Sequence, residues 1–320
     1  MLGSILRNPT QLGVACAASA AVMFTANDTV LKFMSGAYAL HEIVLIRSII
    51  GLLVACVLIF PFAGGFAILR TRRLGLHIVR GLFVVLANMT FFVGLASLPL
   101  AEAVAIFFVA PLLITVFSVV FLREPVGPRR WAAVAVGFAG VVIVQRPGTD
   151  AFQLASLLPV IAAAFYAGLH IMTRFIGKTE SAATMIFYNQ LTFIAVCLLF
   201  WVAVGDGRYG DQESASLAFL LRAWVWPEMS DWPLFLLIGV ATGLGGYLIS
   251  QAYRVAAPAV VAPFEYLSLP TAILAGYLVF NEVPDAAAFL GIGLILGAGL
   301  FIIWREARVD ELADVPRTRR

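Results

Sequence analysis

The sequence contains ten apolar runs of roughly 20 residues each, and this feature restricts the possible fold more than any other. An α-helix needs about 20 apolar residues to cross the hydrocarbon of a bilayer. Because lipid offers the backbone no hydrogen-bonding partner, we expect every run to form a helix. The chain is therefore predicted to be an all-α membrane protein with ten transmembrane helices. The runs lie at 11–34, 41–62, 75–97, 100–121, 130–146, 154–173, 182–204, 233–253, 259–280 and 286–304.

The composition agrees with a bilayer as the surrounding medium. Hydrophobic residues make up 62% of the chain and charged residues only 12%, whereas a soluble domain is roughly half apolar and a quarter charged. The net charge of +3 gives no reason to expect a nucleic-acid partner. Cys16, Cys56 and Cys197 all lie in apolar runs, too scattered for a disulfide framework or a metal site. We expect no metal and no cofactor.

The basic residues predict how the helices are oriented. With ten spans both termini lie on one side of the membrane, and the loops on that side hold fifteen Lys and Arg residues. The loops on the other side hold three, namely Arg146, Arg208 and Arg222. Since cytoplasmic loops carry an excess of Lys and Arg, we predict a multi-pass protein of the bacterial inner (plasma) membrane with both termini cytoplasmic. Residues 305–320 are then a cytosolic tail.

The chain also contains an internal repeat. Residues 99–125 align without gaps on 258–284, at an offset of 159. Each predicted half, 11–146 and 154–304, has five helices, and this odd number inverts the second half in the membrane. Inverted repeats are typical of secondary transporters. The identical pairs are Pro99/Pro258, Ala103/Ala262, Pro111/Pro270, Ile114/Ile273, Val120/Val279, Phe121/Phe280 and Pro125/Pro284.

Several segments resemble a known family. FFVGLASLPLAEAVAIFFVAPL at 91–112 and LREP at 122–125, together with Lys32 and Arg47 in the first two runs, are similar to the EamA branch of the drug/metabolite transporter superfamily. The segment 263–284, PFEYLSLPTAILAGYLVFNEVP, also resembles members proposed to move S-adenosylmethionine. The resemblance implies transport of amino acids, their derivatives or other small organic metabolites. It implies no hydrolysis and no bound cofactor.

Three charged residues of the first two predicted spans are of interest, namely Asp28, Lys32 and Arg47. Such groups cost several kcal/mol in a membrane unless they are paired or face water, so each is a candidate site residue. Asp28 and Lys32 are four residues apart and share a helix face. Asp28 and Arg47 lie at matching depths, about 14 Å from the turn that joins their helices. Their pairing could fix the hairpin, recognise a substrate carboxylate or amine, or couple transport to protons. Lys32, nearer the helix end, could extend to water.

Glu265 lies inside the span predicted at 259–280, level with Tyr247 on the neighbouring predicted helix. Burial disfavours a charged carboxylate, so Glu265 could bind a proton or a cationic group such as an amine or sulfonium. Alternatively, a protonated carboxyl bonds to Tyr247, Gln251 or a backbone carbonyl. We expect Asn88 and Tyr166 to add polar atoms to the same pocket.

These observations predict a secondary transporter that moves an amino acid, an amine or a derivative such as S-adenosylmethionine by alternating access. One alternative is an exporter of apolar or drug-like metabolites, and another is a membrane-embedded enzyme or a non-transporting sensor. GxxxxGK[ST], HExxH and GxSxG motifs are absent from the sequence, so we predict no enzyme. The expected partners are a small-molecule substrate and the lipid bilayer. Gly239-x-x-x-Gly243 and Gly293-x-x-x-Gly297 permit close helix packing, and we expect a monomer or a weak dimer.

Overall fold

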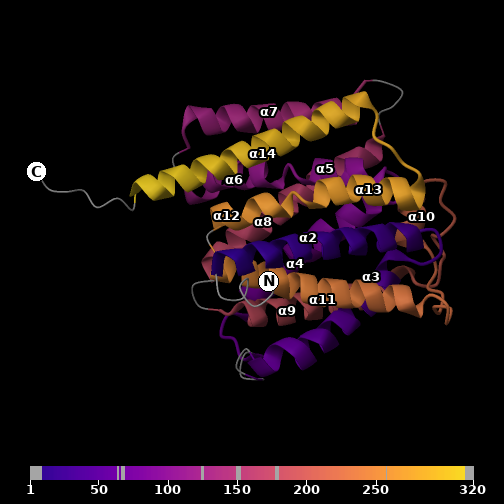
Figure 1. The fold of residues 1–320 in the computed structure, drawn as a ribbon. Helices are drawn as coiled ribbons and strands as arrows, with labels where there is room; N and C mark the ends of the chain where they lie inside the picture. Colours follow the sequence, from indigo (N-terminus) through magenta and orange to yellow (C-terminus); the bar gives the residue numbers. More distant parts are fainter. Residues whose placement is uncertain are drawn as a thin grey trace, which may run out of the picture.

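The computed structural model describes residues 9–62, 65, 69–123, 126–148, 153–176, 180–256 and 258–313. These residues form helices and connecting segments and contain no β-strand. The helices lie side by side in one bundle, with their axes running in a similar direction (Figure 1). They are α2 (Pro9–Met34), α3 (Leu40–Val54), α4 (Leu74–Leu95), α5 (Leu100–Phe107), α6 (Ala110–Leu122), α7 (Pro128–Gln145), α8 (Leu157–Ile176), α9 (Ala182–Val204), α10 (Ala215–Leu221), α11 (Trp232–Val255), α12 (Pro258–Glu265), α13 (Ser268–Phe280) and α14 (Ala286–Ala313).

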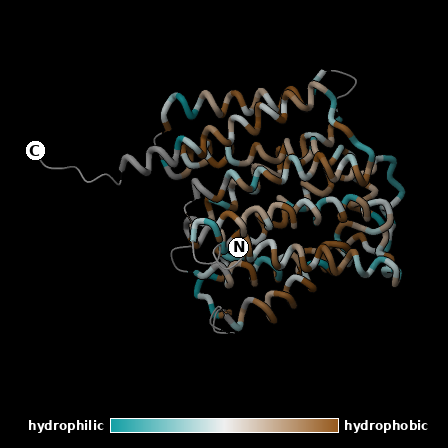
Figure 2. Tube along the Cα trace, in the orientation of Figure 1, coloured by the Kyte–Doolittle hydropathy of each residue, from teal (hydrophilic) through white to brown (hydrophobic). Residues whose placement is uncertain are grey.

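The bundle is that of a multi-pass membrane protein. Within the described residues, nine helical stretches are long and apolar enough to cross a bilayer, and they correspond to nine of the ten predicted spans. Figure 2 shows hydrophobic residues along the helices and hydrophilic ones gathered toward the ends and loops. The remaining predicted span, 130–146, is α7, whose 18 residues include Arg129 and Arg130. It runs along α14 at one edge of the bundle (Figure 1).

Two of the predicted spans, 100–121 and 259–280, are each interrupted in the middle. The first divides into α5 and α6, and the second into α12 and α13. Pro111 and Pro270 follow the interruptions closely. A proline lacks the backbone N–H, and its ring clashes with the carbonyl four residues earlier, so both prolines disfavour a continuous helix and lie instead in the first turn of α6 and of α13.

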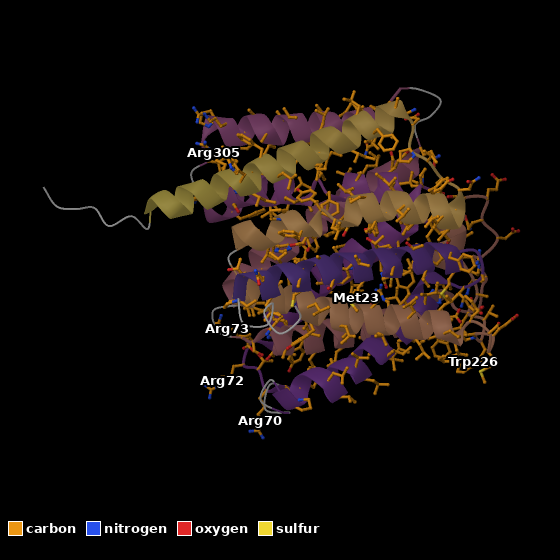
Figure 3. The ribbon with its side chains drawn as sticks, viewed as in Figure 1. Met23, Arg70, Arg72, Arg73, Trp226 and Arg305 are labelled. Atoms are coloured by element: carbon orange, nitrogen blue, oxygen red, sulfur yellow. The ribbon has the colours of Figure 1, made fainter. Side chains whose placement is uncertain are left out.

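The two ends of the bundle differ in chemistry. Arg70, Arg72, Arg73 and Arg305 lie at one end, where α2 begins and α14 extends, and Trp226 lies at the other (Figure 3). We call these the arginine end and the tryptophan end. Residues 205–231 cover the tryptophan end and include the short helix α10, which ends before Trp224 and Trp226.

Hydrogen bonds hold this covering segment against the turn between α2 and α3. The Tyr38 hydroxyl donates to the Asp231 carboxylate at 2.5 Å, and the Arg222 guanidinium donates to the Ser35 carbonyl at 3.1 Å. The pKa of Tyr38 is raised from its ordinary value, first by burial and then by the hydrogen bond to Asp231. The segment is therefore packed onto the bundle at the tryptophan end.

Glycine allows helices to approach closely at the edge formed by α7 and α14. A Cβ atom on Gly140 would lie 2.8 Å from the Gly291 carbonyl oxygen. Of the two predicted small-residue motifs, Gly239 and Gly243 pack within the chain, against Ile50 and Val54 of α3. A Cβ on Gly293 or Gly297 would meet nothing within 4 Å; these positions face open space on α14.

Candidate transport site

A cavity of about 300 Å³ lies inside the bundle, at the two interrupted helices. This volume is at the lower end of the roughly 300–1,000 Å³ found for small-molecule sites. Residues on both sides of each interruption line it. The lining residues are Ala21, Phe24, Asn27, Asp28, Arg47, Ala87, Asn88, Phe91, Phe92, Val104, Phe107, Phe108, Ala110, Pro111, Tyr166, Thr242, Ile249, Glu265 and Ser268.

Five of the eight predicted site residues line this cavity. Asp28, Arg47, Asn88, Tyr166 and Glu265 come from five different helices and from both predicted halves of the chain. The polar side chains meet there because each lies on a helix face turned away from lipid. The structure therefore brings these predicted residues to one place, and their role in binding stays a prediction.

The carboxylate of Asp28 and the guanidinium of Arg47 are connected through Asn27. The Asn27 Nδ2 donates to Asp28 Oδ1 at 3.0 Å, and Arg47 Nη1 donates to Asn27 Oδ1 at 3.2 Å. The Thr242 hydroxyl also lies 3.2 Å from Asn27 Oδ1, as a donor. One carboxamide thus joins α2, α3 and α11. Asn27 was not among the predicted site residues, although a polar residue in an apolar run was the available signal.

Arg47 is a cation held in an almost dehydrated place. The residue is 2% exposed, and its guanidinium lies over the rings of Phe92 and Phe193, at 5.2 and 5.7 Å from the ring centroids. Among the residues that the structure describes, its Nε finds no hydrogen-bond partner. A buried cation is stabilised by aromatic faces and by the nearby carboxylate, but its donors are incompletely used. Arg47 thus places a cation at the wall of the cavity, and its role in binding stays a prediction.

Glu265 is the last residue of α12 and lies directly at the interruption. Its carboxyl group interacts electrostatically with Tyr166, which lines the cavity, and with Tyr266. Tyr247, the predicted neighbour, instead packs against a buried cluster that includes Ala55. Gln251 does not line the cavity either. Equal depth on two helices did not predict a contact, because Tyr247 lies on a face of α11 that is turned toward this cluster.

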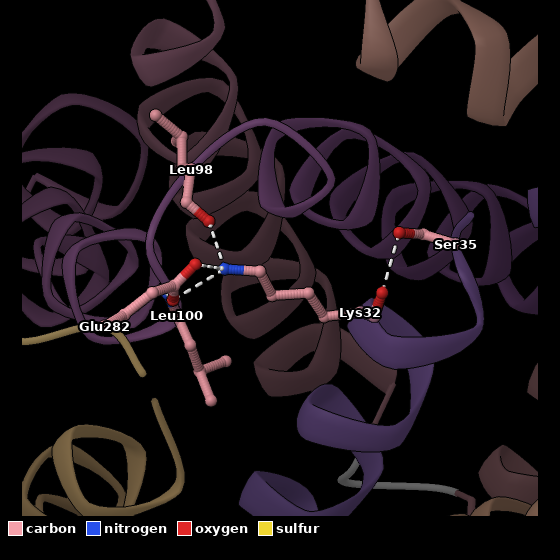
Figure 4. Close-up of polar contacts among 5 residues, drawn as sticks. All are labelled: Lys32, Ser35, Leu98, Leu100 and Glu282. Carbon is pink, nitrogen blue, oxygen red and sulfur yellow. Dashed lines mark hydrogen bonds and ion pairs between the residues drawn. The ribbon is translucent and has the colours of Figure 1, made fainter. Parts of the chain in front are cut away.

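Lys32 also lies outside the cavity. Its Nζ binds both carboxylate oxygens of Glu282, at 2.6 and 2.7 Å, and the Leu98 carbonyl at 2.7 Å (Figure 4). The sequence had suggested that Lys32 could extend to water. In the structure Lys32 instead forms an ion pair with a residue 250 positions away in the chain. Sequence reasoning did not single out Glu282, because its position between two apolar runs suggested an exposed loop.

Arg80 is a further ionisable residue that sequence reasoning missed. It lies in the second turn of α4, well inside a membrane-spanning stretch. Its Nε donates to the Thr173 hydroxyl on α8 and its Nη1 to the Asn189 side chain on α9, both at 2.9 Å. These bonds join three helices between the cavity and the arginine end. The sequence contained the signal, because Arg80 is a charged residue inside the predicted span 75–97 and such a residue needs partners.

A membrane-spanning helical bundle with interrupted helices and ionisable side chains around an internal cavity has the architecture of a membrane transporter. Comparison with known proteins identifies the family. Residues 11–146 match the EamA-like transporter family. The chain is 32% identical over 309 residues to the riboflavin transporter of Vibrio cholerae, covering 95% of this chain and 97% of that protein.

Two further relatives are also transporters. The riboflavin transporter of Rhizobium johnstonii is 34% identical over 244 residues, covering 76% of this chain and 75% of that protein. The S-adenosylmethionine uptake transporter of Rickettsia bellii is 28% identical over 289 residues, covering 90% and 91%. The chain belongs to the EamA-like transporter family of the drug/metabolite transporter superfamily, as its motifs had indicated, and it is a small-metabolite secondary transporter. The names of the family and its relatives describe transport rather than catalysis.

Proposed function

We propose that this protein moves a flat heteroaromatic metabolite across the bacterial inner membrane by alternating access, with riboflavin as the first candidate substrate. The observation that carries the proposal is the composition of the cavity. Aromatic rings and ionisable side chains line one cavity, at the point where two helices are interrupted. In transporters, broken helices form the substrate site in the middle of the membrane.

The aromatic residues favour a flat ring as the substrate. Phe107 packs between Phe91 and Tyr166, with ring centroids 5.2 and 5.3 Å apart, and Phe108 packs on Tyr266 at 4.8 Å. Aromatic faces of this kind can stack on a flat ring system whatever the arrangement of polar atoms around that ring. Two riboflavin transporters among the relatives support the same substrate class.

The polar residues favour a ring that carries both hydrogen-bond acceptors and donors. Asn27 occupies the space between Asp28 and Arg47, accepting from the arginine and donating to the carboxylate. A ligand edge with a carbonyl beside an N–H group would present the same pattern. The Asn27 hydrogen bonds thus support a substrate with this chemistry beside Asp28 and Arg47.

A second candidate is a cationic amine or sulfonium metabolite such as S-adenosylmethionine. The carboxyl groups of Asp28 and Glu265 line the same cavity and could balance its positive charge. The transporter from Rickettsia bellii supports this candidate. An exporter of apolar compounds is less well supported, because a purely apolar substrate would leave Asp28, Arg47 and Glu265 without a polar ligand group.

For the architecture we propose two inverted five-helix halves, at 11–146 and 154–304, with α7 as the tenth crossing. The lengths of the interrupted pieces support this arrangement. Both α5 and α12 have 8 residues, and both α6 and α13 have 13. The corresponding helices start 158 residues apart, one residue from the offset of the sequence repeat. Two related halves can rock about the cavity between them.

The orientation follows from the arginine end. Arg70, Arg72, Arg73 and Arg305 lie there, and cytoplasmic surfaces carry such an excess of basic residues. We therefore propose that this end is cytoplasmic, with both termini and the tail 305–320 on the same side. The tryptophan end then faces the periplasm, and the Trp226 side chain lies at the level of the lipid headgroups.

The experiment is ligand binding followed by flux. The purified protein in detergent is unfolded by heat with riboflavin, S-adenosylmethionine, an amino acid or a nucleoside present. A ligand at about 100 times its Kd adds about 2.7 kcal/mol of stability, which gives a measurable rise in Tm. Radiolabelled uptake into proteoliposomes then separates a transporter from a non-transporting sensor.

The Glu265→Gln variant separates the two substrate classes. We expect riboflavin to stabilise the wild type and this variant alike, because stacking does not need the carboxylate. Stabilisation by S-adenosylmethionine alone, lost in Glu265→Gln, would favour the second candidate. No stabilisation by any of these compounds, together with no flux, would refute the proposal.

A further inference from the structure

The connection between α13 and α14 holds the two predicted halves together at the tryptophan end. It comprises residues 281–285 and carries two carboxylates, Glu282 and Asp285. Glu282 forms an ion pair with Lys32 on α2, and Asp285 forms one with Arg146 at the end of α7. Both partners belong to the first half. One short connection from the second half is therefore fixed to the first half at two points.

The Lys32–Glu282 contact is the more enclosed of the two ion pairs. Its side chains are 10% and 29% exposed, against 28% and 55% for Arg146 and Asp285. Glu282 Oε2 also accepts from the Leu100 backbone N–H at 3.0 Å, at the start of α5. The Lys32 ammonium has three donors, and the two Glu282 oxygens and the Leu98 carbonyl lie within reach of them.

The ion pair lies directly between the cavity and the tryptophan end. Lys32 is one helical turn beyond Asp28 on α2, and Leu100 is one turn before Val104 on α5. Asp28 and Val104 both line the cavity. Four residues of α-helix span about 6 Å, so on both helices the ion pair forms the next layer outward from the cavity. Figure 4 shows Glu282 reaching across to Lys32 and to the α4–α5 turn.

We propose that Lys32 and Glu282 form the gate at the tryptophan end: their ion pair closes the cavity on that side and must separate in each transport cycle. This inference rests on the alternating-access mechanism proposed above. A charged pair with its own hydrogen bonds has two defined states, joined and separated, as a gate between packed elements requires. A static structural pin would use the same contacts but would stay closed while the protein transports.

The test links the two positions covalently. In a background in which Cys16, Cys56 and Cys197 are alanine, Lys32→Cys and Glu282→Cys are joined by a reducible bifunctional thiol reagent about as long as the two side chains. Riboflavin uptake into proteoliposomes should fall at least tenfold on linking and return on reduction. Uptake at an unchanged rate in the linked protein would overturn the proposal.

The matched control links two positions within one half at the same end. Asp206 and Arg208 form an exposed ion pair within the segment that covers the tryptophan end. The same reagent on Asp206→Cys and Arg208→Cys should leave uptake within twofold of the unlinked protein. A comparable loss of uptake in this control would mean that the reagent itself inhibits transport, and it would overturn the proposal that Lys32 and Glu282 form the gate.

A second readout does not depend on flux. Ser268→Cys places a thiol in the cavity lining, and its labelling by a membrane-impermeant maleimide is measured from each side. Lys32→Met and Glu282→Gln should each raise labelling from the tryptophan end several-fold, and the charge-swapped pair Lys32→Glu with Glu282→Lys should restore the low rate. Unchanged labelling in both single variants would overturn the gate. Labelling changes without flux of any substrate would instead count against the proposed function alone.

Discussion

Replacing Asn27 by alanine is the perturbation that most directly tests the arrangement of the cavity. Asn27 is 4% exposed, and its side chain contacts three polar partners, Asp28, Arg47 and Thr242. The Asn27→Ala variant removes the carboxamide that lies between the carboxylate and the guanidinium. Arg47 then loses a hydrogen-bond acceptor in a place where water has little access.

The expected magnitude follows from the bonds that are lost. A hydrogen bond to a charged group contributes about 1.5–3 kcal/mol in proteins, and Asn27 makes two. Side-chain bonds within membranes average about 0.6 kcal/mol, and a new direct contact between Asp28 and Arg47 would recover part of the loss. We therefore expect a loss of about 1–3 kcal/mol. At about 2–4 °C per kcal/mol, a loss of about 2 kcal/mol lowers Tm by about 4–8 °C.

The assay uses thiols that the protein already contains. Cys16 and Cys197 are buried, so a thiol-reactive fluorophore reports their exposure as the protein unfolds in detergent. The control is Asn88→Ala, which also alters the cavity lining but removes a bond to the Val84 carbonyl on the same helix. We expect Asn88→Ala to change Tm by less than about 2 °C. Equal shifts in the two variants would refute the bridging role of Asn27.

Three further predictions address other parts of the molecule. Phe107→Ala should weaken riboflavin binding, measured by fluorescence quenching, about 10- to 100-fold, because stacking worth about 1–3 kcal/mol is lost. The control Phe121→Ala changes a residue that is 63% exposed and should leave riboflavin binding in the same assay unchanged. Gly140→Val should destabilise the protein by about 1–3 kcal/mol in the same thermal assay, because its side chain would overpack the α7–α14 contact, while Gly293→Ala should be neutral or slightly stabilising. The pKa of Asp285 lies below its ordinary value, mainly because an arginine donates a hydrogen bond to its carboxylate. At neutral pH the wild type should therefore have a higher Tm than the Asp285→Asn variant. This difference in Tm should vanish as the pH falls through the lowered pKa and the carboxylate is protonated.

The class of fold and the family could be predicted from the sequence because they depend on local properties. A run of about 20 apolar residues spans a bilayer whatever its neighbours are, and nine of the ten predicted runs correspond to spanning helices. The repeat between 99–125 and 258–284 needed only the order of residues. Asp28, Arg47 and Glu265 could be selected from the sequence, because charged residues inside apolar runs require an explanation.

The partners of those residues could not be predicted, because they depend on which helix faces meet. Nothing in the sequence near Lys32 indicates a contact with Glu282, which lies 250 residues away. Equal depth in the membrane suggested Tyr247 as the neighbour of Glu265, but Tyr247 lies on a face of α11 that packs against the buried cluster of Ala55, Phe60 and Ala183.

The apolar runs thus determined that this protein is a helical membrane protein with ionisable residues in its interior, and the internal repeat and the family motifs indicated a transporter. Tertiary structure decided that Asn27 separates Asp28 from Arg47, that Lys32 pairs with Glu282 and that Arg80 joins three helices. The physical reason is that a helix fixes which side chains share a face through local hydrogen bonds alone, whereas contacts between helices depend on rotation and crossing angle, which only the packed bundle defines.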